Sequence, residues 1–171
     1  GRIGPILDSI RHIYAMGLWL EIVTLLIPGF NDSDDELRKL TDFVAGVSPD
    51  IPWHVTAFHA DYKMQDERDT TVEDLLRAVE IGRNAGLRYI YAGNLPGMVE
   101  EWEDTRCPGC HETLIRRYGY FIADYRLTPE GRCPLCAYQM PGRWARKFDG
   151  QITDRPFVPH NRSRLFTITS R

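Results

Sequence analysis

The sequence predicts an α/β protein that carries a small four-cysteine metal module. In the first 93 residues, stretches with helical periodicity alternate with short apolar stretches. This order is typical of a parallel sheet whose strands are joined by helical crossovers. Further along, all four cysteines of the 171-residue chain fall into two Cys-x-x-Cys pairs. These two observations carry the prediction.

Three amphipathic segments are predicted to be helices. They cover residues 6–16, 33–47 and 70–86. Apolar side chains recur along one face of each. Two of the helices open with the spacing of a capping box, at Ser33 and Glu36 and at Thr70 and Glu73. Glycine follows the first helix and closes the third, as expected at a helix end.

Three apolar segments, residues 18–27, 52–58 and 87–93, are predicted to be the strands. The first is apolar on both faces apart from Glu21, so we expect it to be buried on both, as in a parallel sheet. Three strands and three helices amount to half of a barrel or of a wound sheet. We therefore expect one sheet edge to expose unpaired backbone and apolar side chains.

The domain organisation follows from these elements. Residues 1–98 form the α/β part, with the segment GNLPGMVEEWEDT as a linker, and residues 99–144 form the cysteine module. The polar residues 145–171 are predicted to be a loosely ordered tail. The chain begins with Gly1 and enters directly into a helical pattern. This start predicts a fragment of a longer protein.

The cysteine pairs predict a metal site of the zinc-ribbon type. Cys107 and Cys110 form one pair, and Cys133 and Cys136 form the other. Two intervening residues let a tight turn aim both thiolates at one point, and four thiolates complete a tetrahedron around zinc. The intervening segment is rich in aromatic and branched residues and predicts a hairpin. Iron at the same four thiolates, free buried thiols and disulfides are the alternatives. His111 is expected beside the metal and not as a ligand.

The composition limits the classes of function. The net charge of −3 indicates no strong field for nucleic acid. No apolar run approaches the ~18 residues that a membrane span requires. Paired cysteines without a visible signal peptide favour a reducing, cytoplasmic compartment.

The candidate chemistry lies where the predicted strands end, because ligands bind beyond the carboxyl ends of parallel strands. Gly29 follows the first strand and allows close approach to a ligand, although an ordinary turn explains it equally well. His54 and His59 lie within and just past the second strand, with packed histidines as the alternative. Glu21 lines a reaction chamber if the strand faces a barrel interior; otherwise it is a partnered structural carboxylate.

The segments WLEIVTLLIPGFNDSDDEL, PWHVTAFHADYKM, AGLRYIYAGNLPG and CPGCHETLIRRYGY…CPLC occur in this order. Together they resemble the radical S-adenosylmethionine (SAM) enzymes of the AmmeMemoRadiSam system, which are similar to pyruvate formate-lyase activating enzymes. The resemblance covers about residues 1–144. It implies the C-terminal half of a partial (β/α) barrel with an appended zinc ribbon.

In that family, a Cys-x-x-x-Cys-x-x-Cys loop in the N-terminal half holds a 4Fe-4S cluster. The cluster cleaves SAM to a 5′-deoxyadenosyl radical, which abstracts hydrogen from a substrate. This chain has no such loop, so the resemblance implies that it is inactive without the missing half of the barrel. By the same resemblance, Gly29, Asn31, His54 and His59 lie near SAM, and Glu21 is a possible catalytic residue. The substrate is unknown, with a protein as one candidate.

A second hypothesis belongs to a different class. In it, the chain is a zinc-ribbon module on an α/β scaffold that binds protein or nucleic acid.

Overall fold

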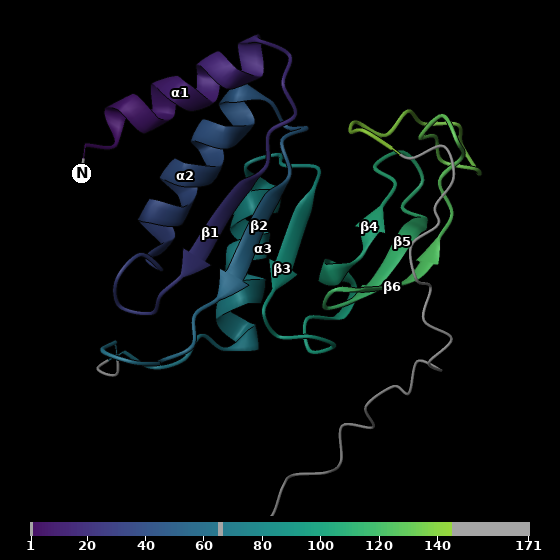
Figure 1. The fold of residues 1–171 in the computed structure, drawn as a ribbon. Coiled ribbons are helices and arrows are strands. Elements are labelled where there is room, and N and C mark those ends of the chain that lie inside the picture. The colour runs from purple at the N-terminus through teal and green to yellow at the C-terminus, as the bar shows by residue number, and fades with distance from the viewer. Residues whose placement is uncertain (1, 65–66, 145–171) are drawn as a thin grey trace, which may run out of the picture.

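A computed structural model of the protein describes residues 2–64 and 67–144. Two three-stranded sheets lie side by side, one parallel and backed by helices, the other antiparallel and bearing the cysteine loops (Figure 1). The predicted α/β class and the small cysteine module are thus both present. The predicted tail, residues 145–171, lies outside the described residues.

The parallel sheet contains β1 (Ile22–Leu26), β2 (Trp53–Ala57) and β3 (Ile90–Gly93), in that order. Helices α2 (Asp34–Val47) and α3 (Val72–Asn84) cover one of its faces. The core between helices and sheet is built from fully buried side chains, among them Leu26, Trp53, Val55, Leu75 and Leu37. Alternate residues of each strand point into this core, as the two-residue repeat of a strand requires.

The helix starts follow local capping chemistry. Ser33 caps α2 by accepting a hydrogen bond from the backbone N–H of Glu36, as predicted. At α3 the capping box is formed by Thr71 and Asp74, one residue later than predicted. Thr70 is engaged elsewhere, because its hydroxyl accepts from the backbone N–H of Phe58 and donates to a carbonyl of β1.

The first strand differs from the expectation that both of its faces are buried. Val23 is 66% exposed and Leu25 is 44% exposed. Both helices of the core lie on one side of the sheet, so the other face of β1 has no layer against it. Within the described residues β1 pairs only with β2, so it is an edge strand that exposes apolar side chains, as expected.

The first helix, α1 (Gly4–Ala15), lies against α2 and has no buried residue. Arg11 stacks its guanidinium over the ring of Phe43, 4.8 Å from the ring centroid. The apolar stripe predicted for this helix is therefore only partly covered.

The second sheet contains β4 (Thr105–Arg106), β5 (Thr113–Tyr118) and β6 (Phe121–Tyr125). The segment predicted as a linker carries a short 3-10 helix, η1 (Glu100–Glu103). Val99 in that segment is fully buried in the core of the first sheet, so the segment is packed. Among the described residues, no helix combines the length and the apolar character that crossing a membrane requires.

Candidate metal centre and the open sheet face

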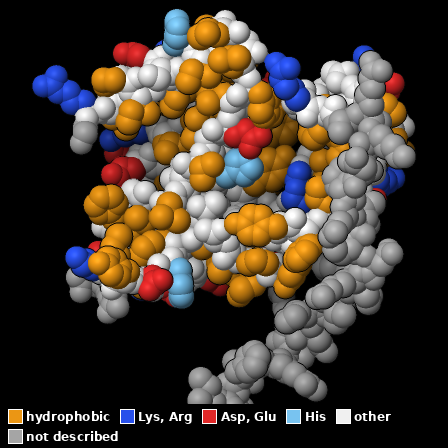
Figure 2. Space-filling model, in the orientation of Figure 1, with side chains coloured by type: hydrophobic (Ala, Val, Ile, Leu, Met, Phe, Trp, Pro, Cys, Tyr) orange, Lys and Arg blue, Asp and Glu red, His pale blue; other side chains and the backbone are white. Residues whose placement is uncertain are grey.

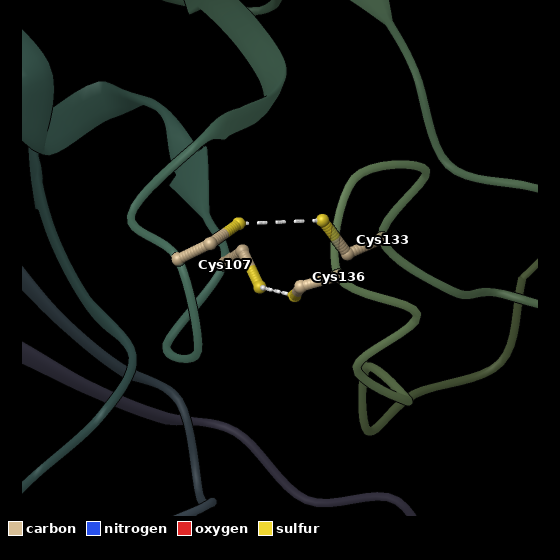
Figure 3. A group of neighbouring side chains, drawn as sticks. Cys107, Cys133 and Cys136 are labelled. Carbon is tan, nitrogen blue, oxygen red and sulfur yellow. Dashed lines mark hydrogen bonds between the residues drawn. The ribbon is translucent and has the colours of Figure 1, made fainter.

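The four cysteine sulfurs converge on one point. Cys107 Sγ lies 3.5 Å from Cys136 Sγ, and Cys110 Sγ lies 3.6 Å from Cys133 Sγ (Figure 3). All four sulfurs lie within 4.8 Å of one another. Zinc–sulfur bonds of about 2.3 Å in a tetrahedron place neighbouring sulfurs about 3.8 Å apart. The predicted cluster could therefore hold a single metal ion. Thiolates of an iron–sulfur cluster bind different irons and stand farther apart.

Two loops of matching geometry build this cluster. In the first, the N–H of His111 donates to the carbonyl of Cys107 at 2.8 Å. In the second, the N–H of Ala137 donates to the carbonyl of Cys133 at 3.0 Å. The residue after each second cysteine is left-handed, with φ of 63° at His111 and 59° at Ala137. This shared turn aims both thiols of a pair in one direction, toward the other pair.

The backbone favours negative charge on the sulfurs. Burial opposes ionisation of Cys133, but the N–H groups of Cys136 and Leu135 donate to its sulfur, and its pKa falls to about 7. Burial raises the pKa of Cys107 to about 12, against donation from Cys110 and Gly109. A divalent cation would hold such thiols as thiolates.

His111 contributes backbone and not imidazole. Its carbonyl accepts a hydrogen bond from Arg106 Nε at 3.0 Å. The metal-competent group found among the described residues contains the four cysteines and no histidine.

Glu21 and His54 meet on the face of the parallel sheet that the helices do not cover, which we call the open face. Glu21 directly precedes β1, and its Oε2 lies 2.8 Å from His54 Nε2 on β2. Trp19 Nε1 donates to the other carboxylate oxygen at 2.8 Å. The imidazole of His54 stacks on Tyr91 of β3, with the ring centroids 4.9 Å apart. A polar row thus runs across all three strands.

The row continues into the second sheet. The hydroxyl of Tyr91 lies 3.0 Å from Thr105 Oγ1 on β4. The guanidinium of Arg117 on β5 lies over the Tyr91 ring, 5.6 Å from its centroid, and donates to Thr105 Oγ1 at 2.6 Å. Sequence reasoning missed Tyr91 and Arg117. The alternation along the third strand was the only available signal, since Tyr91 occupies the same face as His54.

The other predicted binding residues lie elsewhere. Gly29 and Asn31 build the turn after β1: Gly29 has φ of 76°, and the Asn31 amide donates to the carbonyl of Leu25 at 3.0 Å. His59 follows β2, and its Nδ1 lies 2.7 Å from Asp69 Oδ2. His54 lines a hollow beside the open face, and Gly29, Asn31 and His59 are not among the residues that line it. The structure therefore does not bring His54 together with Gly29, Asn31 and His59.

A hollow of about 610 Å³ lies between the open face and the second sheet. Its floor includes Glu21, His54 and Tyr91, and its far wall includes Ile122, Met140 and Trp144. Figure 2 looks onto this side and shows apolar side chains across it, with isolated charged and histidine side chains among them. The volume is in the range of small-molecule sites.

Comparison with known proteins gives one relative. The chain is 36% identical over 134 residues to the uncharacterized protein MJ0808 of Methanocaldococcus jannaschii. This match covers 77% of the chain but 40% of the relative, so the chain corresponds to less than half of that protein. No protein-family model matches the chain. No solved structure matches it significantly.

Proposed function

We propose that this chain is the C-terminal sector of a radical SAM enzyme, in which the open face of β1–β3 lines the inside of a partial barrel. The polar row on that face carries the proposal. This face bears Glu21, His54 and Tyr91, and His54 contacts both of the other side chains. The sequence resemblance and the greater length of the archaeal relative support the same reading.

The cysteines present do not fit the 4Fe-4S cluster that such an enzyme needs. All four cysteines of the sequence belong to the compact tetrahedral group. None remains for an iron–sulfur cluster, which residues outside this sequence would have to hold. We therefore derive no step of radical chemistry from these residues.

For the four-cysteine site we propose a structural zinc ion. Zinc with four thiolates is a closed site without a position for substrate. It would fix the two loops that carry the wall of the hollow. Iron at the same ligands is the alternative, and elemental analysis of protein purified under anaerobic conditions distinguishes the two.

The test compares two polypeptides: the 171-residue chain and a longer protein that contains it together with a Cys-x-x-x-Cys-x-x-Cys loop upstream. Both are reconstituted anaerobically with iron and sulfide, reduced, and assayed for 5′-deoxyadenosine. We expect product from the longer protein and none from the 171-residue chain. Product from the shorter chain at a comparable rate, or none from either, would refute the proposal.

One observation favours the second hypothesis, a ribbon that binds another macromolecule. At the tip of the β5–β6 hairpin, Tyr120 is 99% exposed and Phe121 is 55% exposed. Exposed aromatic side chains of this kind mark interaction sites. A pull-down with Phe121→Ser as the matched variant tests this reading, because Phe121 does not line the hollow. If this reading is right, the parent chain captures a binding partner that the variant does not capture. SAM cleavage by the longer protein should be the same with and without the substitution.

A further inference from the structure

Among the described residues, the carboxylate of Glu21 contacts the side chains of Trp19 and His54. One oxygen accepts from the indole of Trp19, and the other lies against His54, each at 2.8 Å. A neutral imidazole with its proton on Nε2 is sufficient for the second contact. Each oxygen retains a lone pair, and the side chain is 43% exposed toward the hollow. Among the described residues, no lysine or arginine forms an ion pair with Glu21.

Arg117 also lines the hollow, and acidic residues lie beside it. Arg117 donates to the carbonyl of Glu103, and its backbone N–H donates to the Asp104 carboxylate at 2.8 Å. Burial raises the pKa of Asp104, while the hydrogen bond from the Arg117 backbone and the charges of Arg116 and Arg117 oppose that rise. The carboxylate of Glu103 is held there too, by the N–H groups of Gly97 and Gly119. Arg117 therefore lies among acidic residues, whereas Glu21 pairs with no lysine or arginine among the described residues.

Two walls of the hollow suit a cation. Trp19 lines it beside Glu21, and Trp144 lines it on the far wall. The faces of aromatic rings attract ammonium and guanidinium groups, most strongly where water is excluded. Apolar surface between the rings, from Val23 and Ile122, would contact an aliphatic stem.

We propose that this hollow binds an alkylammonium or guanidinium group, paired with Glu21 and lying between the indole rings of Trp19 and Trp144. Two sources could supply the group: a free amine, or a lysine or arginine side chain of a peptide. The volume of about 610 Å³ accommodates either. The proposal does not require radical chemistry. If cation binding is not found, the expected result of the SAM cleavage test does not change.

The test is calorimetric titration of the metal-loaded 171-residue chain. The free amine is n-butylammonium, and the side chain is represented by N-acetyl-lysine methylamide. The neutral comparator is N-acetyl-norleucine methylamide, which keeps most of the stem and loses the charge. We expect both cations to bind and the norleucine compound to bind at least about tenfold more weakly. The tighter of the two cations identifies the source.

Variants locate the site. Glu21→Gln keeps the shape and removes the charge, and we expect it to weaken cation binding about tenfold. Glu73→Gln, an exposed carboxylate at the start of α3, is the matched control and should leave binding unchanged. If Glu21→Gln melts at a lower temperature than the parent chain, salt dependence provides a second readout. Cation affinity should then fall between about 20 mM and about 200 mM salt.

Three outcomes would overturn the proposal. The first is equal binding of the norleucine and lysine compounds. The second is full cation affinity in a folded Glu21→Gln protein. The third is no binding of either cation up to ~10 mM, which would mean a standard free energy weaker than about −3 kcal/mol.

Discussion

Replacing Cys133 by serine should weaken metal binding and loosen the ribbon. Cys133 is 1% exposed and lies in one cluster with Leu114, Ile115 and Met140. Structural zinc contributes on the order of 10–16 kcal/mol of binding free energy in small zinc-folded peptides. Losing one of four equivalent thiolates should cost about a quarter of that, ~3 kcal/mol, or about two orders of magnitude in metal affinity.

The assay is titration with cobalt(II), followed by competition with zinc. Four thiolates around tetrahedral cobalt give intense thiolate-to-metal absorption, and saturation should occur at one ion per chain. The matched control is His111→Gly. Glycine adopts the left-handed backbone of His111 without strain, so metal affinity should be retained.

Two results would refute this reasoning. Cys133→Ser could still bind one ion with the affinity of the parent chain, and the four sulfurs would then not be the site. His111→Gly could lose as much affinity as Cys133→Ser, and the imidazole would then be a ligand.

Three further predictions concern stability and association. Gly82→Ala should lower the free energy of unfolding by about 1–3 kcal/mol, because the added methyl would lie 2.7 Å from the buried indole of Trp53 on β2. The control Gly46→Ala adds a methyl into open space and should not destabilise the protein. Equal changes for the two variants in urea denaturation would contradict this prediction. Asp74→Asn should cost about 2–3 kcal/mol at pH 7, because hydrogen bonds from Arg68 hold the pKa of Asp74 well below its usual range. The parent chain loses this stabilisation as the pH falls below about 4, so the deficit should shrink there, and a constant deficit would exclude the mechanism. Val23→Lys should reduce self-association, measured by sedimentation velocity, because Val23 is 66% exposed on the edge strand. An unchanged distribution of sedimentation coefficients would show that this edge does not mediate association.

The elements and the metal cluster could be predicted because their signals are local. Helical periodicity and Cys-x-x-Cys spacing act over a few residues. The shift of the capping box by one residue shows a limit of prediction from neighbouring residues alone. Thr70 and Thr71 both precede an acidic residue at the required spacing. The choice between them depends on the contacts of Thr70 with Phe58 and Leu26, which are distant in the sequence.

The polar row could not be predicted, because it depends on strand alignment. The pairing of Glu21 with His54 requires the parallel register in which Val23 lies beside His54. The contact of Tyr91 with Arg117 requires that the second sheet fold back against the first. The expectation that β1 is buried on both faces was wrong for a related reason. An apolar sequence shows that both faces of a strand could be buried, but it does not show whether another layer packs on each face. In this structure β1 has a covering layer on one face only.

The wall of the hollow and the metal loops are parts of one packed unit. Met140 is 2% exposed in the same cluster as Cys107 and Cys133, and Trp144 donates to its carbonyl at 3.1 Å. Both residues also line the hollow. We therefore expect the proposed metal and the proposed ligand of the hollow to be thermodynamically linked. If the metal orders this wall, it raises the affinity of the hollow for its ligand, and by reciprocity the ligand raises the affinity for the metal by the same factor. Depletion of the metal would then weaken ligand binding in the hollow without any competing ligand.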